Sequence, residues 1–204
     1  MSDTYRTIAN AVQIAFKVNG SRFIGDAYPV ADRDAADAQI EAVQARERDA
    51  THHCTAYRVG PSGDVFCYND DGEPSGTAGP PILRQIDGRD LTNTLVVVTR
   101  YYGGTKLGTG GLVRAYGDAA AEALDAARIV ERVIRVPVRI GFDYDDTSAA
   151  NRLLQQFDVD VIDRDYTDVT RWTLGVRRSE VERFHAAFVE ALADRGWVVD
   201  GDMD

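Results

Sequence analysis

The chain has 204 residues, of which 44% are hydrophobic, and its formal net charge is −10 at pH 7. This length suits one large domain or two small ones with hydrophobic cores, and the acidic charge argues against broad affinity for nucleic acids. No apolar run approaches the roughly 18 residues of a transmembrane helix, and the N-terminus lacks the basic and apolar segments of a signal peptide. Two cysteines are too few for a disulfide framework. We therefore expect a cytoplasmic protein that does not contact membranes.

The kinds of charged residue are unusual. Only two of the 23 basic residues are lysine, and 25 of the 33 acidic residues are aspartate. A strongly charged, Asp-rich surface keeps a protein soluble at high salt, so we expect a protein of a halophilic archaeon. A GC-rich genome would also favour arginine over lysine, but it would not explain the excess of aspartate over glutamate.

The N-terminal part of the chain begins with an expected β-hairpin followed by a helix. Val12, Ile14 and Phe16 alternate with polar neighbours, which is the pattern of a half-buried strand. Asn19-Gly20 is a strong signal for a type I′ turn into a return strand. Asp32 is placed to cap a helix that runs to about residue 48, with acidic residues early and arginines late, as the helix dipole favours.

Two further expected strands, residues 51–59 and 64–68, are followed by a polar loop rich in turn-forming residues. The next strand contains an uninterrupted apolar run, Leu95–Val98, which is typical of a strand buried on both faces. A glycine-rich turn then leads into a helix that runs to about residue 128 and carries an apolar stripe at i, i+4 spacing. That stripe consists of Leu112, Tyr116, Ala120 and Leu124.

The glycine-rich turn lies in a basic segment of an acidic chain. Leu91–Gly117 contains no carboxylate, whereas the overall composition would place about four acidic residues in a segment of this length. With Thr109 as the N-cap of the following helix, free backbone N–H groups and the positive end of the helix dipole would face an anion. The sequence predicts a phosphate or other anion site at 103–111, although the glycines would equally serve a tight turn. The residues of this expected site are Gly103, Gly104, Lys106, Gly108, Gly110, Gly111 and Arg114.

Several potential metal ligands occur upstream, but their spacing does not predict a metal centre. His52 and His53 are adjacent on an expected strand, so their side chains point to opposite faces, and the two cysteines lack the spacing typical of zinc sites. The acidic cluster of Asp70, Asp71 and Glu73 is a candidate for Mg²⁺ near a phosphate, or simply a solvated turn with local hydrogen bonds. We expect no bound metal and no cofactor.

A second domain is expected at residues 133–204, after a first domain at residues 1–132. The strands and helices expected there follow the order βαββαβ, which is the split βαβ or ferredoxin-like arrangement. Pro137 indicates an edge strand, because proline cannot donate a hydrogen bond to a neighbouring strand. Ser179 and Glu182 form a capping-box pattern at the start of the last helix.

Three long motifs resemble the IMPACT/YigZ family. They are Thr-His-His-Cys-Thr-Ala-Tyr (51–57), Asn-Asp-Asp-Gly-Glu-Pro-Ser-Gly-Thr-Ala-Gly (69–79) and the segment 99–116, which contains the glycine-rich turn. The resemblance covers essentially the whole chain and implies an α+β protein of two α/β sandwich domains. The first would be similar to ribosomal protein S5 domain 2, and the second to the last domain of elongation factor G.

The resemblance also implies a role in translation. Eukaryotic members of the family regulate translation by binding an activator of the kinase that phosphorylates a translation initiation factor, and prokaryotic members resemble ribosome- or nucleic-acid-associated proteins. No catalytic residues are carried over from the family. We therefore expect a non-enzymatic protein that binds RNA, the ribosome or a translation-associated protein through the loops at 69–80 and 103–111. Its expected binding residues outside the glycine-rich turn are His52, His53, Asp70, Asp71, Glu73, Ser75, Arg100, Tyr101 and Tyr102.

Two alternatives are open at the level of sequence. One is an enzyme acting on a phosphorylated small molecule or nucleotide, because small-molecule kinases of a similar fold use glycine-rich phosphate loops; this is an analogy of fold alone. The other is a protein-interaction module, with Arg100, Tyr101 and Tyr102 as anchors, since Arg and Tyr dominate binding energy at many interfaces. One difference from the family is Pro80, which stands where a basic residue is common.

Overall fold

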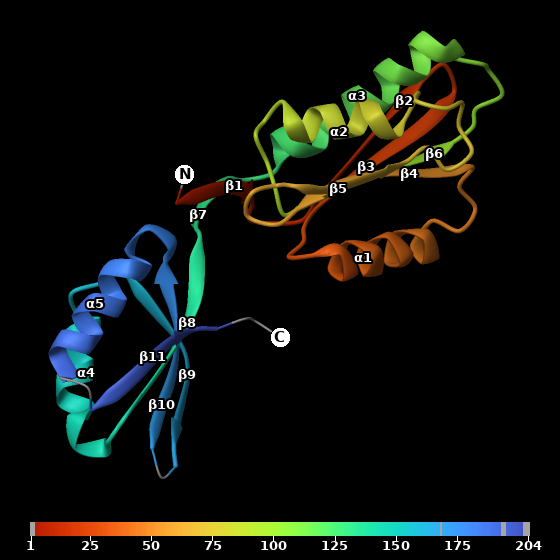
Figure 1. Cartoon of the computed structure of the whole chain (residues 1–204). Helices are drawn as coiled ribbons and strands as arrows, with labels where there is room; N and C mark the ends of the chain where they lie inside the picture. Colours follow the sequence, from red (N-terminus) through yellow and green to blue (C-terminus); the bar gives the residue numbers. More distant parts are fainter. Residues whose placement is uncertain (1–2, 168, 193–194, 202–204) are drawn as a thin grey trace. The chain divides into compact units, whose positions relative to one another are not determined.

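The computed structural model describes residues 3–167, 169–192 and 195–201, so the expected outer limits of the domains, residues 1 and 204, lie outside the described part. The chain divides into two compact units (Figure 1): one is Thr4–Arg132, and the other is the chain from Val133 onward together with Asp3. Both units combine antiparallel sheets with helices, which confirms the expected α+β class. None of the described helices has the length and apolar character needed to cross a membrane.

The first unit is built on a five-stranded antiparallel sheet with helices on both faces. Its elements are β2 (Val12–Val18), β3 (Ser21–Pro29), α1 (Arg33–Arg46), β4 (His52–Val59), β5 (Val65–Asn69), α2 (Gly79–Asp87), β6 (Thr94–Tyr101) and α3 (Gly108–Ala126). The strand order is β2-β3-β6-β4-β5. Helix α1 covers one face of the sheet, and helices α2 and α3 cover the other (Figure 1).

β6 is the central strand and is buried on both faces, as its apolar sequence predicts. Leu95 and Val97 belong to a hydrophobic cluster with residues of α1, whereas Val96 and Val98 belong to the larger cluster formed with α2 and α3. All four side chains are fully buried. This double burial fixes β6, and with it the start of the glycine-rich turn that follows Tyr101.

The local turn and cap signals are confirmed at two points. Asn19 and Gly20 have φ angles of 46° and 85°, the positive values that both central residues of a type I′ turn require. Asp32 caps α1, because its carboxylate accepts a hydrogen bond from the backbone N–H of Ala35 at 2.8 Å. Both signals depend only on neighbouring residues, which is why the sequence alone reveals them.

A two-stranded sheet that the sequence analysis did not predict pairs the beginning of the first unit with its end. It consists of β1 (Thr4–Ile8) and β7 (Ile129–Val133). Beside it, the backbone N–H of Ala9 donates to the carbonyl of Arg128 at 2.8 Å. Both strands are short and lie far apart in the sequence, so their pairing leaves no local pattern to recognise.

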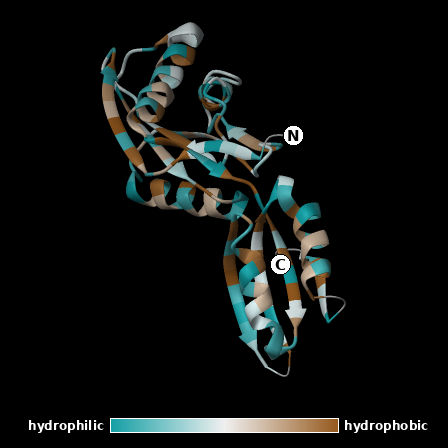
Figure 2. Ribbon diagram, turned by 90° about the vertical axis from the view of Figure 1, so that its left-hand side faces the viewer, coloured by the Kyte–Doolittle hydropathy of each residue, from teal (hydrophilic) through white to brown (hydrophobic). Residues whose placement is uncertain are grey.

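The second unit has a four-stranded antiparallel sheet with two helices on one face (Figure 1). Its elements are β8 (Arg135–Phe142), α4 (Thr147–Leu154), β9 (Val159–Tyr166), β10 (Thr170–Arg177), α5 (Val181–Leu192) and β11 (Gly196–Asp200), with 3₁₀ turns at Tyr144–Asp146 and Arg178–Glu180. The strand order is β11-β8-β10-β9, and the βαββαβ order of elements is the one that the sequence predicts. Hydrophobic and hydrophilic segments follow one another along these strands (Figure 2), as expected for a sheet with one buried face.

Pro137 does not lie on an edge strand, so that expectation is wrong. Its strand, β8, lies between β11 and β10. The pairing of β11 with β8 ends where Asp200 faces Val138, and the Pro137 carbonyl accepts a hydrogen bond from the next residue, Gly201, at 2.8 Å. In an antiparallel pair the N and C=O of one residue point to the same neighbouring strand. The missing N–H of Pro137 therefore falls beyond the last paired residue of β11, where the sheet tolerates it.

The expected capping box at the last helix is also wrong. A 3₁₀ turn precedes α5, which begins at Val181. The backbone N–H of Ser179 donates to the Asp3 carboxylate at 2.9 Å, and the Ser179 hydroxyl donates to the same carboxylate. Arg177 pairs with Asp3 as well, at 2.8 Å. A carboxylate from the other end of the chain thus engages Ser179, so this hydroxyl does not cap the helix.

Candidate functional site

Three segments meet at one end of the first unit's sheet. The register pairs Arg22 with Tyr101 and His52 with Arg100. The β2–β3 turn, the start of β4 and the end of β6 therefore lie together. Two loops extend from this end of the sheet, which we call the acidic loop (residues 69–79) and the glycine loop (residues 103–111).

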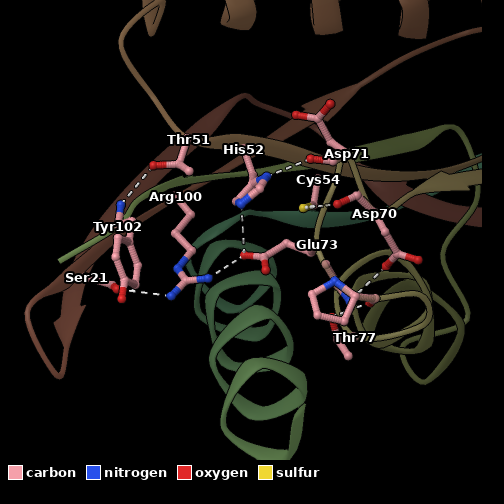
Figure 3. A network of polar contacts seen from close by, with 12 residues as sticks. Ser21, Thr51, His52, Cys54, Asp70, Asp71, Glu73, Thr77, Arg100 and Tyr102 are labelled. Atoms are coloured by element: carbon pink, nitrogen blue, oxygen red, sulfur yellow. Dashed lines mark hydrogen bonds and ion pairs between the residues drawn. The ribbon is translucent and has the colours of Figure 1, made fainter. Parts of the chain in front are cut away.

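Arg100 connects the two loops through its guanidinium group. Its Nη1 donates to Glu73 of the acidic loop at 2.6 Å, and its Nη2 donates to the hydroxyl of Ser21 at 3.3 Å (Figure 3). The same hydroxyl accepts a hydrogen bond from the backbone N–H of Gly103, the first residue of the glycine loop, at 3.2 Å. The guanidinium also lies over the rings of Phe23 and Tyr102. Arg100 is 4% exposed, so it supports the loops from within and is not the exposed binding anchor that the sequence analysis expected.

Glu73 is the buried counter-charge of this network. Its side chain is 4% exposed, and besides Arg100 it accepts a hydrogen bond from the hydroxyl of Tyr116 in α3 at 2.7 Å. His52 Nε2 lies 3.8 Å away (Figure 3). Burial raises the pKa of Tyr116 well above its ordinary value, so the phenol remains a neutral donor. Glu73 therefore holds the acidic loop against the sheet and α3 and is not part of a solvated turn.

The other two carboxylates of the acidic loop point to partners of their own. Asp70 accepts hydrogen bonds from the backbone N–H groups of Gly76, Ala78 and Gly79 at 2.8–2.9 Å. Asp71 accepts from the backbone N–H of His53 at 2.6 Å. Because each carboxylate is engaged separately, the cluster does not converge as Mg²⁺ ligands would. Within the described part of the chain, no group of three His, Cys, Asp or Glu side chains is arranged to hold a metal.

Asp70 is expected to contribute measurably to stability in a pH-dependent way. Burial acts to raise the pKa of its carboxyl, but the three N–H donors outweigh burial and hold the pKa below its ordinary value of 3.8. The contribution is therefore present above the ordinary pKa and is lost as pH falls through the lowered pKa. Asp70→Ala should lower the free energy of unfolding at pH 7 by about 1–3 kcal/mol, measured by urea denaturation. Asp64→Ala, at an exposed aspartate before β5, is the control. An unchanged urea midpoint for Asp70→Ala would contradict this role.

The adjacent histidines lie on opposite faces of β4, as the alternation of strand side chains predicts. His52 faces α3, and its Nδ1 lies 2.7 Å from the carbonyl oxygen of Asp71. His53 faces the α1 side, where its Nε2 lies 3.1 Å from the carbonyl oxygen of Glu47. The next residue, Cys54, is buried, donates to the carbonyl oxygen of Asp70 at 3.0 Å, and has a thiol pKa raised to about 12 by burial. Cys54 is therefore poorly suited to act as a nucleophile.

The glycine loop is exposed from Gly103 to Lys106, and exposed glycines also open α3. The helix begins at Gly108 with Leu107 in the N-cap position and without a side-chain cap, so the expected capping role of Thr109 is wrong. Exposed Arg114 follows within the first two turns of the helix. Among the described residues, neither Lys106 nor Arg114 has an ion-pair partner. The loop and the start of α3 thus present backbone N–H groups without a side-chain cap and two exposed cations.

Three other expected binding residues differ in their accessibility. Tyr101 is partly buried, and its hydroxyl donates to Glu47 on the α1 side at 2.9 Å. Tyr102 is 47% exposed, and its backbone N–H donates to the hydroxyl of Thr51 at 3.0 Å (Figure 3). Ser75 is exposed on the acidic loop. Of the expected aromatic anchors, Tyr102 is therefore the accessible one beside the glycine loop.

Ser21, Thr51 and Tyr116 belong to this network but are not predicted from the sequence. The sequence predicts Tyr116 as a member of the apolar stripe of α3, but its hydroxyl gives no separate signal. Ser21 follows the Asn19-Gly20 turn and is indistinguishable in sequence from an ordinary turn residue. Their partners are at least 43 positions away in the sequence, so only the assembled sheet identifies them.

Comparison with known proteins covers both units. The family model described as the Impact N-terminal domain matches residues 19–124, and a model described as a domain of unknown function (DUF1949) matches residues 140–195. "IMPACT family member YvyE" of Bacillus subtilis is 32% identical over 203 residues, covering 100% of this chain and 94% of that protein. "IMPACT family member YigZ" of Escherichia coli is 34% identical, covering 89% and 90% respectively. A crystal structure of a hypothetical protein matches with a TM-score of 0.77 at 30% identity over the full length of both chains.

Proposed function

Because the chain belongs to the IMPACT family, we propose that it is a non-enzymatic, translation-related protein that binds RNA, the ribosome or a translation-associated protein. Its family membership supports the role in translation, since the eukaryotic members that the sequence resembles regulate translation. Membership by itself does not identify the binding surface, which has to be argued from the site.

The observation that carries the proposed surface is the exposure of the glycine loop together with two cations that lack partners in the described structure. Backbone N–H groups at the start of a long helix favour an anion, and Lys106 and Arg114 add positive charge. Tyr102 is 47% exposed and offers a stacking surface next to the loop on the face of its ring that Arg100 does not cover. The buried Glu73–Arg100 pair holds the base of the loop in place, which lowers the cost of ordering it on binding.

The acidic remainder of the chain limits how such a surface would bind. Binding driven by counterion release weakens steeply as salt rises, and a chain of net charge −10 is repelled by a polyanion elsewhere on its surface. Backbone amides and stacking on Tyr102 would therefore carry more of the affinity than the two cations. This surface fits a locally presented phosphate or acidic group better than an extended nucleic acid.

Replacing both cations should weaken binding without affecting the fold. We expect Lys106→Ala with Arg114→Ala to reduce the affinity for ribosomes from the source organism by about 1–3 kcal/mol, the range of a few charge-assisted hydrogen bonds. Co-sedimentation at several salt concentrations, with and without RNase treatment, measures the loss and separates RNA from protein partners. The matched control is Arg84→Ala with Arg152→Ala, which removes the same charge at two exposed positions elsewhere. Equal binding by the two double variants would contradict the proposed surface.

The alternative of an enzyme acting on a phosphorylated compound is tested by the same proteins. Two of its acid–base candidates argue against it, because Glu73 is held by Arg100 and Tyr116, and the Cys54 thiol has a raised pKa. An enzyme would show phosphate-ester or nucleotide turnover in the wild type that the Lys106 and Arg114 substitutions abolish. A binding protein would show none in either form.

A further inference from the structure

Both lysines of the chain lie at the end of the first unit's sheet where the glycine loop begins. Lys106 is part of that loop, and Lys17 lies near the end of β2. The register pairs Lys17 with Arg22 of β3, and it pairs Arg22 with Tyr101, the last residue of β6. The start of β3 is also hydrogen-bonded to the first residue of the glycine loop. Lys17 and Arg22, which we call the hairpin pair, are therefore held beside the glycine loop.

The hairpin pair points to the α1 side of the sheet. Its neighbours Phe16 and Phe23 pack in the cluster formed with α2 and α3, and side chains alternate between the two faces along a strand. Lys17 and Arg22 are both exposed. Arg114 lies in α3, on the other side of the sheet (Figure 1). Positive charge therefore flanks the glycine loop on both sides of the sheet.

No carboxylate within the described part of the chain forms an ion pair with either member of the hairpin pair. Glu47, which lies on the same side of the sheet, is engaged by Arg46 at 3.1 Å and by the hydroxyl of Tyr101 at 2.9 Å. The Arg22 guanidinium instead lies over the Tyr101 ring, 6.0 Å from its centroid. In a chain with 33 acidic residues, two adjacent cations without a counter-charge are a local exception.

The stability of the fold does not explain the hairpin pair. Like charges directly opposite each other destabilise a sheet. Arg135 and Arg177 are also directly opposed, but the carboxylate of Asp158 lies 2.8 Å from one and 3.7 Å from the other. A charge on an edge strand such as β2 prevents unwanted strand pairing, but the edge strands β9 and β11 carry aspartates for that role. A carboxylate in place of Lys17 would protect the edge and pair with Arg22 as well.

We propose that the hairpin pair is a second anion-binding position beside the glycine loop, and that the ligand is a short run of phosphates. This inference rests on the proposed function, because it extends the surface assigned there. Residues that break a local rule of stability are typical of functional sites. A single phosphate bound at the start of α3 would leave the hairpin pair without a counter-charge, whereas consecutive phosphates supply charge on both sides of the sheet. RNA backbone and free polyphosphate share this chemistry.

Lys17→Glu tests the proposal with two measurements that should change in opposite directions. The new carboxylate would lie opposite Arg22, so the urea midpoint of unfolding should rise. The affinity for a fluorescein-labelled oligouridine, measured by fluorescence anisotropy at low salt, should fall at least about tenfold. The slope of log affinity against log salt should decrease by about one, as expected when a phosphate contact is lost. A variant that merely damaged the fold would lose both stability and binding.

The matched control is Arg152→Glu, which makes the same change of charge at an exposed position of α4. It accounts for the more negative overall charge and should retain wild-type stability and most of the binding. Arg22→Glu reverses the other member of the hairpin pair and should weaken binding as Lys17→Glu does. Equal affinity of Lys17→Glu and Arg152→Glu for the oligouridine overturns the proposal, as does a urea midpoint of Lys17→Glu at or below that of the wild type.

Competition with inorganic tripolyphosphate distinguishes the two sources of phosphate. Displacement of the labelled oligouridine by tripolyphosphate supports a site for phosphate runs of either origin, and displacement by unlabelled oligouridine alone supports RNA. A wild type that binds neither probe overturns the proposal.

The protein with Lys106→Ala and Arg114→Ala separates this inference from the proposed function. If it loses affinity for the oligouridine and Lys17→Glu does not, the glycine loop binds alone and the hairpin pair is not part of the site. If Lys17→Glu loses affinity and the alanine variant does not, the glycine-loop surface fails and the hairpin pair stands. If neither loses affinity, both assignments are wrong.

Discussion

Glu73→Gln is expected to lower the free energy of unfolding of the first unit by about 3–5 kcal/mol, the usual cost of leaving one member of a buried ion pair without its partner. The substitution keeps the shape of the side chain but removes its charge. Arg100 would then keep a buried cation that is hydrogen-bonded to neutral groups only, since its other side-chain partner is the hydroxyl of Ser21. Urea denaturation followed by circular dichroism measures the loss.

Two further variants test whether the loss of stability in Glu73→Gln arises because its ion pair with Arg100 is buried. Asp125 pairs with Arg89 at 2.5 Å, but its side chain is 66% exposed, so Asp125→Asn should cost less than about 1 kcal/mol. Combining Glu73→Gln with Arg100→Met removes the uncompensated cation as well, and should recover part of the stability that Glu73→Gln alone loses. Similar losses for Glu73→Gln and Asp125→Asn would show that the buried pair does not hold the acidic loop as we infer.

Gly103→Ala is expected to destabilise the first unit by about 3 kcal/mol or more, at the upper end of the cost of inserting atoms into a packed site. A Cβ at this position would lie 1.9 Å from the backbone carbonyl carbon of Gly20 and 2.2 Å from the backbone nitrogen of Ser21. These are backbone atoms of the β2–β3 turn, which cannot rotate away as a side chain can. The turn or the glycine loop would have to move, and the hydrogen bond from Gly103 to Ser21 would be lost with it.

Gly110→Ala is the control for Gly103→Ala. Gly110 lies in the first turn of α3, and a Cβ there would have no atom within 4 Å. Because alanine is favoured over glycine within helices by up to about 1 kcal/mol, the variant should be as stable as the wild type or slightly more so. Both variants are compared by thermal melting. If Gly103→Ala melts like Gly110→Ala, the close backbone approach at Gly103 does not constrain the fold.

The different roles of the glycines also refine the expectation from sequence. The sequence predicts an anion site at 103–111, with a tight turn as the equal alternative role of its glycines. In the structure, Gly103 serves a close approach within the protein itself, whereas Gly104 and Gly108 adopt positive φ angles of 84° and 70° with open space around them. A ligand could therefore approach the part of the loop after Gly103, but the first glycine is needed for packing.

The sequence by itself determined the features that depend on neighbouring residues. The Asn19-Gly20 turn, the Asp32 cap and the apolar run of β6 follow from backbone preferences and from side-chain alternation over a few positions. The order of elements in the second unit could be read for the same reason. His52 and His53 were correctly assigned to opposite faces, because a strand leaves no other arrangement.

Only the tertiary structure decided which of these local features meet. Glu73 and Arg100 are 27 positions apart, and the sequence predicts both as binding residues, because a charge is normally solvated unless a partner accompanies it into the interior. The sequence predicts an edge position for Pro137, because it does not show that β11 pairs with β8 only as far as Val138, one residue short of Pro137. The contact of Gly103 with Gly20 likewise depends on which strands lie side by side. Strand order is set by burial summed over the whole unit, and no short segment of the sequence contains that information.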